Sequence, residues 1–195
     1  MPQTELSRNA QVLRYFLTEA PGIGRTQLVK FAYLADCEAR KYLGRAISTF
    51  RYVLYHHGPF DPAFYGALEE LKQGGFVTET PTVFPNGYEG YHVHPTSRSV
   101  EFRFTLPEVE LLRYVAQTYL GMTARDLCDD VVYQTEPMRE ARMNEELPMD
   151  RLNNQERKEL GFDLEQLLAS EASVAAGRHR PLAEAIRELR ARYHS

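Results

Sequence analysis

Three amphipathic segments followed by a pair of extended runs constrain the fold of this chain more than any other feature. Apolar residues recur at helical spacing over residues 4–19, 26–44 and 61–74, and glycine or proline ends each segment. This spacing places the apolar side chains on one face of each helix, and that face must be buried against another element. We therefore predict a helical core in the N-terminal part of the chain, with Thr26 capping the second helix.

Extended segments lie between and after these helices. Residues 50–55 are rich in aromatic and β-branched side chains, as strands are, and the runs 76–82 and 88–94 flank an Asn-Gly dipeptide at 86–87 that suits a tight hairpin turn. The order helix, helix, strand, helix, hairpin is also that of a winged helix. We expect the strand near Val53 and the hairpin to form one small antiparallel sheet.

Further helices are predicted in the C-terminal half. Pro107 stands at one helix start, and residues 123–126 read Thr-Ala-Arg-Asp, which is similar to a capping box. Two more amphipathic helices are expected to begin near Asp163 and Pro181. The predicted fold class is therefore α+β and predominantly helical, with a winged-helix-like helical core, a small antiparallel β-sheet and C-terminal helices.

A polar stretch suggests how the chain divides. Residues 144–154 are polar and are interrupted by Pro148, which indicates a linker. We predict one domain over residues 1–143 and a linker with a helical C-terminal appendage over residues 144–195.

The composition is that of an ordinary globular protein, with 43% hydrophobic and 26% charged residues among 195. The formal net charge is -4, whereas proteins that bind many phosphates usually carry a surplus of Lys and Arg, so nucleic acid is not the expected partner. The N-terminus has no apolar run of the signal-peptide kind, and no apolar stretch is long enough to cross a bilayer. Together with two distant cysteines, this predicts a cytoplasmic protein with reduced thiols.

No motif indicates catalysis or cofactor binding. Cys37 and Cys128 both stand beside acidic residues, which raise the pKa of a thiol and disfavour a nucleophilic thiolate. The sequence contains no Gly-x-Ser-x-Gly, phosphate loop or His-Glu-x-x-His. We therefore predict a protein that is not an enzyme and binds no cofactor.

Four histidines fall near the ends of predicted neighbouring strands: His56, His57, His92 and His94. A metal site would need two or three of them to converge with a carboxylate such as that of Asp61. Adjacent strand residues point to opposite faces, so only one of the first two could join the second pair. Solvated or hydrogen-bonded histidines are the favoured interpretation, and whether the set binds anything stays open.

A DNA-binding transcriptional regulator is the main alternative function. In a winged helix the third helix enters the major groove. The exposed side of that helix would carry Asp61, Tyr65, Glu69, Glu70, Lys72 and Gln73. This face has more acid than base, and the predicted wing over residues 78–89 adds two glutamates without any Lys or Arg. Both elements would repel phosphates.

Several phrases of the sequence, in this order, resemble the Panacea domain family of SocA-like antitoxins. They are LVKFAYLAD (28–36), YVLYHHGPF (52–60), YGALEEL (65–71), LPEVE (106–110), TARDL (123–127) and TEPMR (135–139). Together they span roughly the first three quarters of the chain. One departure is Met138, at a position where the family often has Trp, so a contact made there is not carried over.

The resemblance implies a protein-interaction module that neutralises a toxin by direct binding. One relative in the family acts as an adaptor that delivers its toxin to a protease, and members occur alone or near prophage genes. The resemblance therefore implies a protein partner, with a proteolytic-adaptor role and association with phage as further implications. Self-association through the C-terminal helices also stays open.

The predicted partner-binding surface rests on this resemblance and on the enrichment of aromatic residues at interfaces. It comprises Lys30, Tyr33, Tyr55, His57, Gly58, Pro59 and Tyr65. The alternative for the corner at residues 55–59 is a purely structural turn, because Gly and Pro commonly mark the end of a strand.

Overall fold

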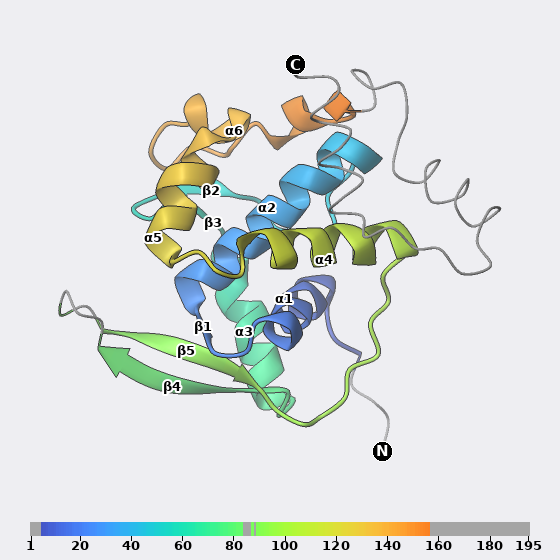
Figure 1. Cartoon of the computed structure of the whole chain (residues 1–195), viewed down its shortest axis with the longest axis vertical. Helices are drawn as coiled ribbons and strands as arrows, with labels where there is room; N and C mark the ends of the chain where they lie inside the picture. Colours follow the sequence, from blue (N-terminus) through green and yellow to red (C-terminus); the bar gives the residue numbers. More distant parts are fainter. Residues whose placement is uncertain (1–4, 84–86, 88, 157–195) are drawn as a thin grey trace.

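Four α-helices form the core of the part of the chain that the computed structural model describes, which is residues 5–83, 87 and 89–156. They are α1 (Arg8–Glu19), α2 (Arg25–Leu43), α3 (Ala63–Gln73) and α4 (Leu106–Tyr119). α1, α2 and α4 pack against one another, and α3 packs on α1 (Figure 1). Within these described residues no helix is both long and apolar enough to span a membrane. The predicted helices near residues 163 and 181 lie outside them.

The ends of the helices follow local signals in the sequence. Gly44 ends α2 in the left-handed conformation, with φ 71°, which glycine adopts without a steric penalty. α4 opens with a capping box, in which the Glu108 carboxylate accepts a hydrogen bond from Thr105 N at 2.8 Å. The prediction that Thr26 caps α2 is wrong, because the preceding strand runs directly into the helix and Gly24 takes the cap position.

The larger sheet has the strand order of a winged helix. β4 (Val77–Val83) and β5 (Glu89–Pro95) form the predicted antiparallel hairpin, and β1 (Ile23–Gly24) pairs with β5, so the order is β1-β5-β4. The chain therefore runs helix, strand, helix, helix, strand, strand around this sheet, with β2 and β3 inserted between α2 and α3. The predicted fold class, α+β and predominantly helical with a winged-helix-like core, is confirmed.

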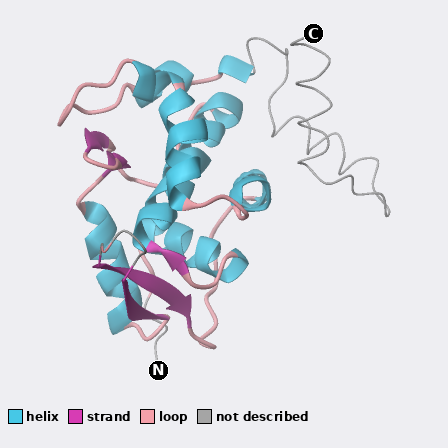
Figure 2. Ribbon diagram, turned by 60° about the vertical axis from the view of Figure 1, so that its left-hand side comes forward, coloured by secondary structure: helices cyan, strands magenta, loops and turns pink. Residues whose placement is uncertain are grey.

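β2 (Val53–Tyr55) does not join this sheet, so the predicted pairing of the strand near Val53 with the hairpin is wrong. It pairs instead with β3 (Gly58–Phe60) in a two-stranded sheet that lies apart from the hairpin (Figure 2). Gly58, with φ 92°, allows the chain to turn back two residues after β2 ends. The other edge of β2 is bound by the backbone of residues 144–147. Both edges are therefore already paired.

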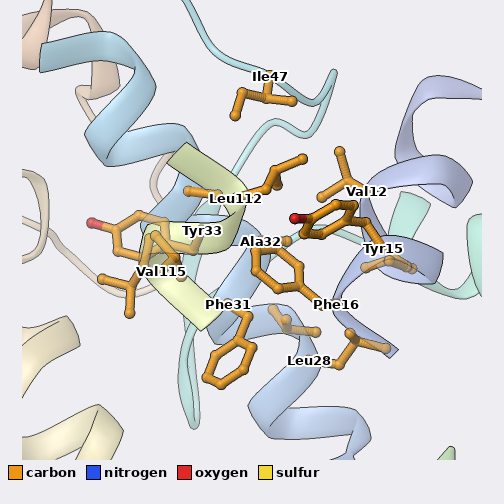
Figure 3. Packing of buried hydrophobic residues seen from close by; sticks show 14 of the residues in the cluster. Val12, Tyr15, Phe16, Leu28, Phe31, Ala32, Tyr33, Ile47, Leu112 and Val115 are labelled. Atoms are coloured by element: carbon orange, nitrogen blue, oxygen red, sulfur yellow. The ribbon is translucent and has the colours of Figure 1, made fainter. Parts of the chain in front are cut away.

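Aromatic and aliphatic side chains from α1, α2 and α4 fill the core (Figure 3). Phe16 of α1 and Phe31 of α2 meet edge to face, with ring centroids 5.3 Å apart. Leu112 and Val115 of α4 belong to the same cluster. Because α2 is covered by helices on more than one side, some of its polar side chains are buried as well, and these shape the site described below.

Asp36 fixes the segment between α2 and β2. Its buried carboxylate accepts hydrogen bonds from the backbone N–H groups of Ile47 and Ser48, each at 2.8 Å, and from the Tyr52 hydroxyl at 2.8 Å. The Ser48 hydroxyl donates to the same carboxylate. Burial raises the pKa of Asp36, and these hydrogen bonds oppose the rise. The segment therefore reaches β2 in one defined conformation.

Short helical turns follow α4. They are α5 (Ala124–Asp126), a π turn (Leu127–Val131), α6 (Glu136–Arg139) and two 3₁₀ turns (Val132–Gln134 and Met149–Leu152). The predicted cap at Thr123 is confirmed, because its hydroxyl accepts a hydrogen bond from Asp126 N at 3.2 Å. Leu147, Met149 and Leu152 are buried, so the described part of the predicted linker packs on the core. The division of the chain after residue 143 stays a prediction.

Glu108 joins α4 to α1 and to the loop after α2. Its carboxylate is buried and lies 2.6 Å from the guanidinium of Arg8 and 2.5 Å from that of Arg45. Burial raises the pKa of Glu108, but the hydrogen bonds from the two arginines and from Thr105 N outweigh this, so the pKa lies below its ordinary value of 4.5. The cluster therefore contributes stability at neutral pH.

Glu108→Gln is expected to lower the free energy of unfolding at pH 7 by about 2 kcal/mol, because two charge-assisted hydrogen bonds lose their acceptor charge. Since the folded pKa is lowered, this contribution is present above the unfolded pKa and is lost as the pH falls through the folded pKa. Urea unfolding at pH 7 and at acidic pH measures both effects. An equal difference between variant and wild type at both pH values would contradict this role of the charge.

Candidate functional site

A cleft of about 620 Å³ opens between the start of α2, the β2–β3 hairpin and the start of α3. Aromatic side chains form much of its lining: Tyr55, Phe60, Phe64 and Tyr65, together with the rings of His56 and His57. From α2 the cleft receives Arg25 and Lys30, which are its cationic side chains. A hollow of this size with apolar walls and a few charged groups is typical of a binding site.

Five of the seven residues predicted as a partner surface line this cleft: Lys30, Tyr55, His57, Gly58 and Tyr65. They come from α2, the β2–β3 hairpin and α3, which lie far apart in the sequence. The structure therefore brings most of the predicted set together in one place.

Two predicted residues do not reach the cleft surface. The side chain of Tyr33 is 0% exposed, its ring meets Tyr52 at 5.2 Å and its hydroxyl lies 2.7 Å from Thr135 Oγ1. The expected surface position of Tyr33 is therefore wrong, because α2 is also covered by the C-terminal half of the domain. Pro59 is buried too, and its carbonyl faces Lys30.

Lys30 is a buried cation at the bottom of the cleft. Its side chain is 3% exposed, and its ammonium donates a hydrogen bond to Pro59 O at 2.8 Å. Burial lowers the pKa of Lys30 to about 8, and the nearby Cys128 raises it slightly. Among the described residues no carboxylate forms an ion pair with this ammonium.

Gly58 allows the ammonium to lie where it does. A Cβ at this position would lie 3.3 Å from Lys30 Nζ and 3.8 Å from the Tyr133 hydroxyl, and the residue has φ 92°. A side chain here would therefore be strained and would crowd the lysine. The corner at residues 55–59 can therefore be a structural turn and part of a binding surface at once, since Gly58 both closes the β2–β3 turn and leaves room above Lys30.

Exposed rings continue from the cleft across the surface as a row that we call the aromatic stripe. In spatial order it consists of His56, Tyr55, Phe60, Tyr65, Arg25 and Tyr91. Neighbouring rings lie 4.4 to 5.9 Å apart between centroids, and the Arg25 guanidinium lies 6.0 Å from the Tyr65 ring and 4.0 Å from the Tyr91 ring. Tyr55, Tyr65 and Tyr91 are 45%, 54% and 42% exposed.

Arg25 is held in this stripe by Glu79 of β4. Its guanidinium donates two hydrogen bonds to the Glu79 carboxylate, at 2.5 and 2.6 Å, and Lys72 of α3 lies 3.2 Å from the same carboxylate. A bidentate hydrogen-bonded ion pair of this kind fixes the plane of the guanidinium. Arg25 is therefore held over the Tyr91 ring, and this contact ties the β4–β5 hairpin to the start of α2.

The sequence prediction did not include Arg25, His56, Phe60 and Tyr91 in the contact surface. Phe60 and His56 are in the phrase that carries the family resemblance, so aromatic content alone could have suggested them. Arg25 and Tyr91 meet only because β1 pairs with β5 beside them. A two-residue strand leaves no periodic signal, so their contact could not be read from the sequence.

The cysteines are not placed as nucleophiles. Burial raises the pKa of Cys37 to about 12, and burial also raises the pKa of Cys128 despite the opposing charge of Lys30. The pKa of both thiols is therefore raised as predicted, but burial contributes more to this rise than the acidic neighbours do.

The four histidines belong to two different sheets. His56 and His57 form the β2–β3 turn, whereas His92 and His94 lie on β5. His92 Nδ1 lies 2.7 Å from Gly22 O, which joins it to the loop before β1. The histidines were expected on neighbouring strands, and this expectation is wrong because β2 pairs away from the hairpin.

Comparison with known proteins identifies the family. Residues 28–136 match the family described as antitoxin SocA-like, Panacea domain, and the chain belongs to this family. The match includes all seven predicted contact residues and every member of the aromatic stripe except Arg25. No curated protein and no solved structure matches the chain. Membership of an antitoxin family relates the protein to toxin–antitoxin systems.

Proposed function

We propose that this protein is an antitoxin that neutralises its toxin by direct binding, and that the cleft and the aromatic stripe form the binding surface. The observation that carries the proposal is the continuous row of exposed and half-buried aromatic rings along a hollow with a buried cation. Monomeric globular proteins rarely expose such a patch unless it binds something. The family relates the chain to toxins but does not identify one.

The residue types of the stripe are those that supply most binding energy in protein interfaces. Tyr and Arg are enriched among interface hot spots, and a ring already held by its neighbours loses little conformational entropy on binding. Tyr55 and Tyr65 both contact Phe60, and Arg25 is fixed by Glu79. The stripe is therefore pre-organised for contact with a protein surface. We propose a non-catalytic role; delivery of the toxin to a protease and self-association are extensions of this proposal.

DNA binding is the alternative that the winged-helix order suggests. On α3 the exposed side carries Glu69 and Glu70, and Lys72 lies 3.2 Å from each of two carboxylates, those of Glu69 and Glu79. On the hairpin Glu89 is an exposed acid, and Glu79 is paired with Arg25 and Lys72. This charge distribution favours a protein partner over a phosphate backbone. Tight, salt-sensitive binding to upstream DNA in fluorescence anisotropy would favour the regulator instead.

Affinity capture of the tagged protein from its own host tests the proposed function. Bound proteins and bound nucleic acid are both identified, and each captured protein is then expressed alone and together with this chain. The proposal predicts one stoichiometric protein partner that stops growth when expressed alone and is harmless in the pair. Capture of DNA without such a protein would contradict it.

A further inference from the structure

No carboxylate of the described residues forms an ion pair with the buried Lys30 ammonium. Removing a charge from water is unfavourable unless it is paired, and a lysine ammonium has three N–H donors. Among the described residues, the Lys30 ammonium donates a hydrogen bond to Pro59 O, at 2.8 Å. Gly58 and Cys128 lie beside the ammonium, and neither carries a carboxylate.

Two acidic side chains beside residues that line the cleft are already engaged elsewhere. Glu79 binds Arg25 and Lys72. Asp61 accepts hydrogen bonds from the backbone N–H groups of Arg51 and Ala63, at 2.6 and 2.8 Å. Arg25, the other cation of the cleft, is neutralised by Glu79. Of the two cationic side chains in the cleft, Lys30 is therefore the one that forms no ion pair with the part of the chain that the structure describes.

From this charge arrangement we infer that the cleft accepts a carboxylate of the partner protein, which pairs with Lys30 while apolar or aromatic neighbours of that carboxylate pack on Tyr55, Phe60 and Tyr65. The inference rests on the proposed function, and it adds the chemistry of the inserted group. An ammonium in an apolar pocket matches a single negative charge. A phosphate, with more oxygens and more charge, would need several unpaired cationic donors, which the described cleft does not offer.

The source of the carboxylate is either an Asp or Glu side chain or the C-terminus of the partner. Two displayed libraries of random linear peptides separate these sources, one with free C-termini and one in which the random segment is internal. Both are panned against the purified full chain. The inference predicts selected peptides that share a carboxylate next to an apolar or aromatic residue, in one library or in both.

A double-mutant cycle tests the pairing with Lys30 directly. A selected peptide and its matched version without the carboxylate (Asp→Asn, Glu→Gln or C-terminal amide) are titrated against wild type, Lys30→Met and Lys41→Met. Lys41 lies on the same helix, outside the cleft lining. We expect loss of the carboxylate to weaken binding to wild type and to Lys41→Met by about tenfold or more, and to leave binding to Lys30→Met unchanged. Circular dichroism confirms that each variant is folded.

The outcomes separate this inference from the proposed function. Peptides that bind without any carboxylate, or a carboxylate effect that persists in Lys30→Met, would overturn the pairing with Lys30. If those same peptides lose affinity for a Tyr55→Ala/Tyr65→Ala variant, the proposed surface still stands. If no peptide is selected, or if neither Lys30→Met nor Tyr55→Ala/Tyr65→Ala changes peptide binding, the inference is overturned. Either result would also count against the cleft as the binding surface.

Discussion

Asp36→Ala is expected to lower the free energy of unfolding by about 4 kcal/mol, the largest effect that we predict for a single polar side chain. The variant removes the common acceptor of two backbone N–H groups, those of Ile47 and Ser48, and of the Tyr52 hydroxyl. All of these donors are buried, so each would be left without a partner or would draw water into the core. Because the affected segment leads into β2, the cleft would lose its support as well.

Asp36→Asn is the matched control, because it keeps the size of the side chain and one carbonyl acceptor for the two backbone N–H groups. The Ser48 and Tyr52 hydroxyls can rotate to accept from the new amide, so the loss should be about half as large as in Asp36→Ala. Urea unfolding followed by circular dichroism measures both variants. Equal stability of Asp36→Ala and wild type would show that this network does not hold the segment.

Tyr33→Ala is expected to destabilise the fold by about 3–5 kcal/mol, because it removes a fully buried aromatic ring from the core. The ring packs against Tyr52, and its hydroxyl bonds Thr135 in the C-terminal half of the domain. Burial raises the pKa of Tyr33, so the phenol stays neutral throughout the physiological range. Any loss of partner binding in this variant would therefore follow from unfolding, and not from loss of a direct contact.

Tyr33→Phe separates packing from hydrogen bonding at the same position. It keeps the ring and removes only the bond to Thr135, so the expected loss is about 1 kcal/mol. Thermal and urea unfolding of the two variants give the comparison. A loss below about 1 kcal/mol for Tyr33→Ala would contradict the burial of this side chain.

The elements that the sequence predicted well are those with a local physical signal. The spacing of apolar residues predicts α1, α2 and α3, while Gly44 at the end of α2 and Pro107 at the start of α4 follow from the conformational preferences of single residues. The β4–β5 hairpin follows from two extended runs around an Asn-Gly pair, although Asn86 itself lies outside the described residues.

What could not be predicted depends on contacts between distant residues. β1 is two residues long, and β2 finds its partners in β3 and in residues 144–147, so no pattern in the sequence distinguishes these pairings from one with the hairpin. How deeply each side chain of α2 is buried is a second feature that could not be predicted from the sequence. Lys30 and Tyr33 are one helical turn apart and share a side of the helix, yet only Lys30 lines the cleft.

The proposed binding surface was predicted only in part, because its arrangement depends on both kinds of information. Tyr55, Gly58 and Tyr65 belong to phrases that carry the family resemblance, and they line the cleft. The meeting of Arg25 with Tyr91 requires the winged-helix sheet, in which β5 lies beside β1. That Lys30 forms no ion pair within the described residues likewise depends on how the neighbouring acids are paired.

The central claim is that the aromatic stripe binds a protein partner, and the dissociation constant of the captured partner for Tyr55→Ala/Tyr65→Ala tests it most directly. Both side chains are about half exposed and lie outside the buried core, so the protein should still fold, and Leu106→Ala, an exposed apolar residue at the start of α4, is the matched control. We predict that the double variant raises Kd by about 30-fold or more and no longer restores growth, while Leu106→Ala behaves as wild type. An unchanged Kd for a folded Tyr55→Ala/Tyr65→Ala protein would contradict the claim.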